Sequence, residues 1–242
     1  MKLRSVRLWS GATLWIYIAS HLTNHALGLW SIEMAEAGLR VAVWVWHSLP
    51  GTVALYGAFA CHLVLALLGL YRRHSWRMPF SEMCRLAFGL SFPLLLVGHA
   101  VTTRVAYEWY GLLPQYQGVV LSLVSAGAQG RQLALLAPGW VHGCMGLHLA
   151  MRHRAWYAPW KGLCWTVAAG LPLLAAAGFL AMDHEVTRLT QDPAWRARFA
   201  DPLPAVQVQS LRALREQILN DYLLLLLAVP VARALRWLLQ RR

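Results

Sequence analysis

The chain has 242 residues, of which 58% are apolar and 13% are charged, and its formal net charge is +12. This composition is typical of a polytopic membrane protein and excludes an ordinary soluble domain. The excess of Lys and Arg does not indicate nucleic-acid binding, because the basic residues lie at the ends of apolar runs, as in the positive-inside pattern of membrane proteins. Residues 1–242 are therefore expected to form a single transmembrane domain.

Six apolar segments are expected to be transmembrane helices, because each is close to the roughly 20 residues that cross a bilayer. In chain order they cover residues 8–30, 51–71, 85–107, 132–151, 160–182 and 222–239. The fold class is thus an all-α membrane protein, with the first four spans as its core and the last two beside them. Between the spans, Ile32 to His47 is either an amphipathic helix or an interfacial connector, and Val206 to Ile218 has the spacing of a short surface helix.

The distribution of Lys and Arg over the short connections predicts how the chain lies in the membrane. The basic side carries Lys2, Arg4, Arg7, Arg72, Arg73, Arg77, Arg152, Arg154, Lys161, Arg233, Arg236, Arg241 and Arg242. Since short cytoplasmic loops are the ones enriched in Lys and Arg, both termini are expected to be cytoplasmic.

Four of the predicted spans each carry a histidine near mid-membrane, and these histidines fall into two pairs of equal depth. His21 and His99 each follow an arginine by 14 residues, whereas His62 and His142 each precede one by 10. At the helical rise these offsets are roughly 21 and 15 Å from the same set of helix ends. Two histidines level with each other on neighbouring helices are what bis-imidazole haem ligation requires. The pattern predicts two haem b groups with these four iron ligands.

Two further histidines, His25 and His148, lie on the same helices but have no partner at equal depth, so they are second choices as ligands. Histidines can instead hydrogen-bond between membrane helices without any cofactor. A zinc or copper site would need three or four converging donors, and a proton relay would favour intramembrane Asp or Glu, which no predicted span carries at its centre. The four cysteines form no CxxCH motif, so covalent haem is not expected.

Arg104 follows His99 by five residues, toward the outer end of its span. Two roles are open for it. Its guanidinium suits a bidentate contact with the propionates of an outer haem. Alternatively, the side chain snorkels to the outer interface, as arginines near the ends of membrane helices commonly do.

Two segments carry a resemblance to a known family. His21-Leu-Thr-Asn-His25 and His142-Gly-Cys-Met-Gly-Leu-His148 resemble the ligand helices of the haem-b membrane anchors of succinate dehydrogenases and fumarate reductases. The resemblance implies one ligand on each of four helices, with His21 paired to His99 and His62 to His142. In the family's second segment the first histidine is the ligand, which carries over to His142.

A narrower resemblance is to the six-helix membrane anchors that precede class III adenylate cyclases in some proteobacteria. It rests on the two histidine segments together with Tyr71-Arg72-Arg73, Met78-Pro79 and the start of Trp140-Val-His142. It implies a bacterial inner-membrane protein without a catalytic site of its own. Such a protein would exchange electrons with quinone and act on a cyclase domain expected beyond Arg242.

Two other functions are open. One is a cytochrome b anchor that passes electrons between quinone and a soluble redox partner, and the other is a haem-free receptor whose histidines only pack. The expected partners are membrane lipid, quinone and either the cyclase domain or the soluble redox partner, with a second copy of the chain as a further candidate. Nucleic acid is not expected.

Overall fold

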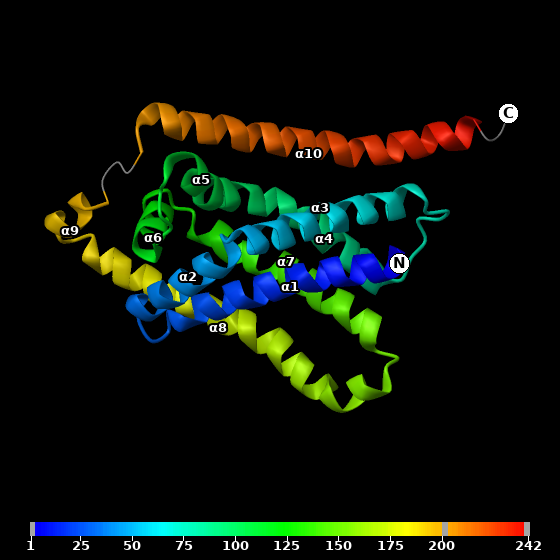
Figure 1. Cartoon of the computed structure of the whole chain (residues 1–242), viewed down its shortest axis with the longest axis horizontal. Helices are drawn as coiled ribbons and strands as arrows, with labels where there is room; N and C mark the ends of the chain where they lie inside the picture. Colours follow the sequence, from blue (N-terminus) through cyan, green and yellow to red (C-terminus); the bar gives the residue numbers. More distant parts are fainter. Residues whose placement is uncertain (1–2, 200–202, 240–242) are drawn as a thin grey trace.

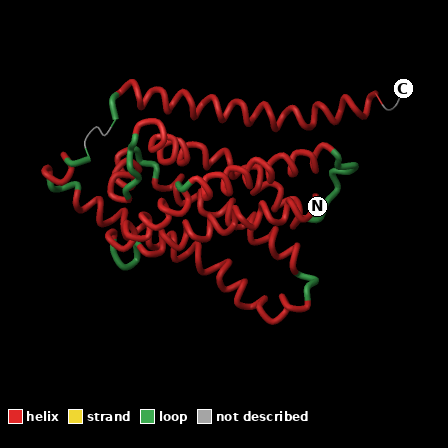
Figure 2. The backbone as a smooth tube through the Cα atoms, in the orientation of Figure 1, coloured by secondary structure: helices red, strands yellow, loops and turns green. Residues whose placement is uncertain are grey.

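The computed structural model describes residues 3–199 and 203–239, and within these ranges the chain is helical and contains no strand (Figures 1 and 2). The predicted all-α fold class is confirmed. Both termini, whose cytoplasmic side was predicted, lie outside the described residues. The helices are α1 (Leu3–Leu27), α2 (Ile32–Trp46), α3 (Leu49–Tyr71), α4 (Phe80–Ala100), α5 (Ala106–Tyr110), α6 (Tyr116–Ser125), α7 (Gln129–Met151), α8 (Lys161–Leu189), α9 (Pro193–Ala197) and α10 (Ala205–Leu239), with the π-helical turn η1 (Val101–Val105) and the 3₁₀ segment η2 (Ala155–Trp160).

Five of the described helices are long and apolar enough to cross a membrane, which corrects the predicted number of six. They are α3, the continuous helix Phe80–Tyr110, α7, the continuous helix Ala155–Leu189, and α10. The helix that differs from the prediction is α1, whose last turns carry His21, Asn24 and His25. The structure explains this composition: α1 packs against α2, α3, α7 and α8. Side chains enclosed by protein can be polar where lipid-facing ones cannot.

Several helix boundaries differ from those expected. The predicted surface helix 206–218 and the predicted span 222–239 form one 35-residue helix, α10. Separating them was wrong, because polar residues such as Asn220 and Asp221 do not end a helix as Pro or Gly would. The connector Ile32 to His47 is indeed largely a helix, α2, and Ser31 caps it by accepting from the Met34 N–H. The helices α6 and α9 were not predicted.

The bundle has two distinct ends (Figure 1). One, here called the basic end, contains the start of α1, the connection between α3 and α4, and the end of α7. The opposite, or far, end contains α2, α6 and α9. The largest apolar core cluster lies at the far end, where Ile32, Tyr116 and Met182 pack together with Trp195. Along one side of the bundle, α10 packs against α3, α4 and η1.

Candidate functional site

All four predicted ligand histidines line one cavity of about 1230 Å³. His21, His62, His99 and His142 reach it from α1, α3, α4 and α7 respectively. Its volume exceeds the roughly 300–1,000 Å³ of a pocket for a single small ligand. The cavity is therefore large enough to hold a bulky cofactor next to each histidine pair.

The structure brings the four histidines together as two pairs. The ring centroids of His21 and His99 are 5.7 Å apart, with an angle of 65° between the ring planes. Those of His62 and His142 are 6.0 Å apart, with an angle of 90°. A ring nitrogen binds a metal at about 2.0 Å, so two imidazoles on opposite sides of one iron have ring centres about 6 Å apart. Both spacings fit a bis-imidazole iron.

The pair at the basic end, His62 and His142, is fixed by hydrogen bonds to Nδ1. His142 Nδ1 lies 2.8 Å from the Arg85 carbonyl oxygen, and His62 Nδ1 lies 3.3 Å from Ser10 Oγ. Since the Ser10 hydroxyl donates to the Arg7 carbonyl at 3.1 Å, Ser10 Oγ is assigned as the acceptor for His62. In both residues Nε2 is then the nitrogen left for a metal, which is the usual arrangement of a metal-binding histidine.

Two glycines make room for the same pair. A Cβ atom on Gly11 of α1 would lie 3.0 Å from Cε1 of His62, and one on Gly89 of α4 would lie 2.5 Å from Cε1 and Nδ1 of His142. The second distance is shorter than side chains tolerate, so Gly89 allows the imidazole of His142 to lie directly against α4. Each glycine thus lets a neighbouring helix present its histidine to the cavity.

The role of these glycines and of Ser10 was not predicted from the sequence, although a signal for the glycines exists. The spacing Arg-x3-Gly-x9-His occurs twice, from Arg7 to His21 and from Arg85 to His99. In each copy the arginine and glycine are four residues apart and share one helix face. The repeat therefore places three features along one helix. They are an arginine, a glycine against which a histidine of a neighbouring helix packs (the seat of that histidine), and a further histidine.

The pair at the far end, His21 and His99, has a third imidazole beside it. His25 Nε2 lies 3.2 Å from His21 Nε2, and the two ring centroids are 4.7 Å apart. His25 lines the cavity, is 5% exposed, and its Nδ1 is buried without a hydrogen-bond partner. Even so, no group of three His, Cys, Asp or Glu side chains within the described ranges is arranged to hold a metal ion.

The other second choice, His148, faces away from the cavity. Its Nδ1 lies 3.0 Å from the Tyr157 hydroxyl, and its ring packs against Trp165. His148 is not among the residues that line the cavity, whereas His142 is. On α7 the geometry therefore favours His142.

Arg104 lies in the π-helical turn η1, at the far-end mouth of the cavity. π-Helical turns of this kind are frequent at functional sites. The guanidinium donates to the Trp46 carbonyl at 3.2 Å and to Thr52 Oγ1 at 2.8 Å, and it pairs with Glu108 at 2.8 Å. Its Nε is buried without a partner, so this donor remains for a ligand.

Beside Arg104 lies a second cavity, of about 460 Å³. It is lined by His47, Leu49, Thr52, Tyr56, Arg104, Val105, Glu108 and Trp109. His47 lies between α2 and α3, and its ring contacts that of Tyr107 at 4.8 Å. Burial, reinforced by the nearby Arg104 charge, lowers the pKa of His47. Neutral imidazole is therefore favoured here, and it can both donate and accept a hydrogen bond.

No family model, curated protein or solved structure matches this chain. The resemblance to haem-b anchors therefore stays an expectation, and the functional argument depends on the geometry of the cavity.

Proposed function

We propose that this chain is a membrane cytochrome b with two haem b groups, one between His62 and His142 and one between His21 and His99. The observation that carries the proposal is the pair of ring spacings, 6.0 and 5.7 Å, across a single large cavity. A packing contact such as His148 with Tyr157 has a similar spacing, 5.8 Å, but it lies outside the cavity, whereas both of these pairs line it from four different helices.

His62 and His142 would hold the basic-end haem through Nε2. Their Nδ1 atoms are fixed by Ser10 and by the Arg85 carbonyl respectively. At the far end, Arg104 is the candidate partner for a propionate. When bound by two imidazoles, haem supplies one-electron transfer and keeps no open iron position for a substrate. The chain would accordingly transfer electrons without catalysing covalent chemistry.

Quinone is the proposed electron partner, and the small cavity beside Arg104 is the candidate site. His47, whose Nδ1 is buried without a hydrogen-bond partner, offers the neutral donor that a quinone carbonyl would need. The basic residues at the end that contains the start of α1 support a cytoplasmic location for that end. The chain would then be a multi-pass protein of a bacterial inner membrane.

The contacts of α10 support a role as an input module for a cytoplasmic domain, such as an adenylate cyclase. Tyr222 donates to the Leu90 carbonyl at 2.9 Å, next to the glycine that seats His142. Further along α10, Arg233 donates to the His74 carbonyl at 3.0 Å and lies over the Trp76 ring at 4.7 Å. A shift at the basic-end pair would therefore reach the helix that leads out of the bundle.

The test of the cofactor is an absorption spectrum of the purified protein, oxidised and reduced, with a count of haem per chain. We expect a sharp alpha band and about two haems, one for each bis-imidazole pair. A count near zero would support the haem-free receptor, and a count near one would leave a single pair as the site.

The test of the input role joins the chain to a cyclase domain and poises the quinone pool oxidised and then reduced. We expect cyclase output to follow the redox state of the pool. If the haems change redox state and the output does not, the alternative of a respiratory anchor is favoured. A reporter fused after Arg242 that is active only in the periplasm would overturn the proposed topology.

A further inference from the structure

The mouth of the large cavity at the basic end carries an excess of positive charge. Among the described residues that line it, one side chain is acidic, Glu82, and the arginines are Arg4, Arg7, Arg73, Arg85 and Arg154. Arg73 and Arg85 are partly buried, and neighbouring cations that lose contact with water are costly unless an anion accompanies them. The composition of this mouth therefore fits a ligand with more than one negative charge.

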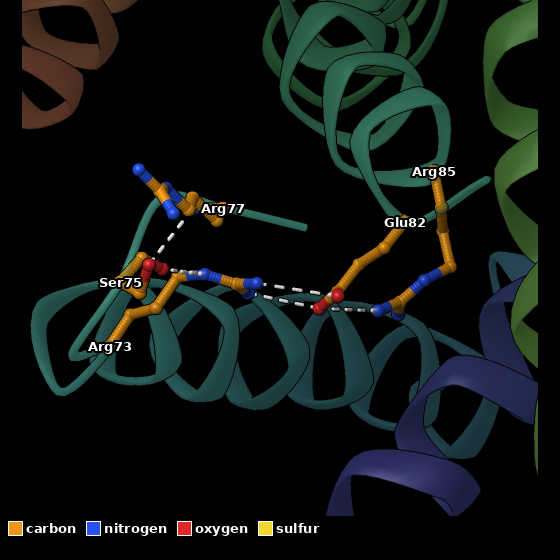
Figure 3. Close-up of polar contacts among 5 residues, drawn as sticks. All are labelled: Arg73, Ser75, Arg77, Glu82 and Arg85. Atoms are coloured by element: carbon orange, nitrogen blue, oxygen red, sulfur yellow. Dashed lines mark hydrogen bonds and ion pairs between the residues drawn. The ribbon is translucent and has the colours of Figure 1, made fainter. Parts of the chain in front are cut away.

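The arginines at this mouth do not all have donors to spare. Arg73 uses its guanidinium on Glu82, with bonds of 2.9 and 3.3 Å, and donates from Nε to the Ser75 carbonyl at 2.7 Å (Figure 3). Arg85 reaches the same carboxylate only at 3.9 Å, and its Nε is buried without a hydrogen-bond partner. Arg73 is thus committed to Glu82, whereas Arg85 keeps donors for a further acceptor.

Arg7 is the counterpart of Arg85 on α1. Within the described ranges no hydrogen bond or ion pair holds its guanidinium, and its charge interacts with that of Arg85. Both arginines begin the repeated spacing Arg-x3-Gly-x9-His. The backbone carbonyl of Arg85 holds His142 directly, and that of Arg7 holds His62 through Ser10. Each arginine therefore anchors one basic-end histidine and presents a guanidinium at the same mouth.

We infer that Arg7 and Arg85 form a two-carboxylate binding site, in which each guanidinium binds one propionate of the basic-end haem. The inference rests on the proposed function, since it assigns the ligand of a site beside His62 and His142. The planar guanidinium matches a carboxylate in two parallel hydrogen bonds. Glu82, itself held by Arg73, is a positioning residue that keeps the Arg85 side chain at the mouth.

The test compares haem b with its dimethyl ester, which lacks the propionate charges. Apoprotein from cells that cannot make haem is titrated with each compound in a His21→Ala background, so that binding reports the basic-end site. We expect Arg7→Gln and Arg85→Gln each to weaken haem b binding roughly tenfold to a hundredfold, as for loss of a charge-assisted hydrogen bond. Their affinity for the ester should match that of the parent chain. The haem b affinity of Arg85→Lys should lie between those of the parent and Arg85→Gln, because lysine keeps the charge but cannot form the two parallel hydrogen bonds of a guanidinium.

Arg72→Gln is the matched control, because Arg72 adjoins Arg73 at the same end and does not line the cavity. It should bind both compounds as the parent does. The same arginine variants in a His62→Ala background report folding, since the far-end site should then load normally. Equal loss of haem b and ester would overturn the inference in favour of a structural role.

Unchanged haem affinity would also overturn the inference, and a simultaneous loss of binding to vesicles containing phosphatidylglycerol would assign the arginines to lipid headgroups. If the parent chain binds neither compound, the proposed function fails first. That outcome is distinguishable from the others, because it affects every variant alike.

Discussion

The two histidine pairs have nearly the same ring spacing, 5.7 and 6.0 Å, and they are held in different ways. At the basic end, both Nδ1 atoms have oxygen neighbours within 3.3 Å, and a glycine lies against each ring. At the far end, His21 instead contacts another imidazole, that of His25, at 3.2 Å. The basic-end pair is thus fixed by a backbone carbonyl and a hydroxyl, whereas His21 of the far-end pair contacts a second histidine side chain.

This difference implies that the basic-end pair is the more preorganised of the two. Oxygen acceptors on Nδ1 set the ring orientation and the tautomer before a metal binds. At the far end, Nε2 of His21 instead lies beside Nε2 of His25, one turn further along α1. A change of one ligand should therefore have a cleaner effect at the basic end.

The largest effect is expected from removing the ligands themselves. His62→Ala and His142→Ala should each remove the same haem and reduce the count from about two per chain to about one, because a bis-imidazole site loses its geometry with either ligand. His21→Ala and His99→Ala should each remove the other. Pyridine haemochrome assays and reduced spectra measure both the number and the identity of the remaining group.

His148→Ala is the control for these variants, since its ring faces Tyr157 outside the cavity, and it should keep both haems. His25→Ala separates the two ends most sharply. If it removes a haem while His21→Ala does not, the far-end ligand on α1 is His25, and the proposed pairing with His99 is wrong there.

A smaller effect is expected from filling the seat of His142. Gly89→Ala would place a methyl group 2.5 Å from the imidazole, so the ring or α4 must move. We expect at least a tenfold loss of haem affinity at the basic end and a destabilisation of roughly 1–3 kcal/mol, as for overpacking elsewhere. Gly57→Ala on α3 is matched, because its Cβ would meet nothing within 4 Å, and it should leave both haems unchanged. Normal haem affinity in Gly89→Ala would show that the seat is not needed.

A subtler change is expected in the redox potential of the basic-end haem. Ser10→Ala removes the acceptor for the His62 Nδ1–H, which lowers the electron donation of the ligand and disfavours ferric iron. A hydrogen bond worth about 1 kcal/mol corresponds to an increase of roughly 40 mV for one electron. Potentiometric titration should show the shift in one haem and not in the other. Ser91→Ala is the control, because the Ser91 hydroxyl bonds the Phe88 carbonyl of its own helix.

Helix type and the proximity of His21 to His99 and of His62 to His142 could be expected from the sequence, because apolar length and the depth of each residue follow from spacing along one helix. The extent of α10 and the number of spans could not. Both depend on which helix faces are covered by protein, as the polar final turns of α1 illustrate. The acceptors for the histidine Nδ1 atoms could not be predicted either, since a backbone carbonyl such as that of Arg85 has no signature in the sequence.

The two ends should also differ in their response to pH, since the carboxyl group at the basic-end mouth, Glu82, is paired with Arg73, whereas Glu36 at the far end has no ion-pair partner within the described ranges. Glu36 of α2 accepts from the Gln117 N–H at 3.2 Å, beside Tyr116, whose ring packs on His25. Burial raises the pKa of Glu36 above its usual 4.5. The folded chain therefore holds this proton more tightly than the unfolded chain, and the stabilisation that the protonated form provides is lost as pH rises from 4.5 through the folded pKa.

Glu36→Gln keeps an acceptor for Gln117 and cannot ionise, so its thermal midpoint in detergent should rise relative to the parent between pH 4 and pH 7. Because Glu36 is only partly buried, solvent screening should keep the difference below about 1 kcal/mol. Glu33→Gln on the same helix is a control of opposite sign. Hydrogen bonds from its own backbone and from Ser31 lower the pKa of Glu33. The thermal midpoint of the parent should therefore rise relative to that of Glu33→Gln as pH rises. Parallel pH curves for the parent and Glu36→Gln would mean that this carboxyl is solvated like any surface group, and that it gives the far end no pH dependence of its own.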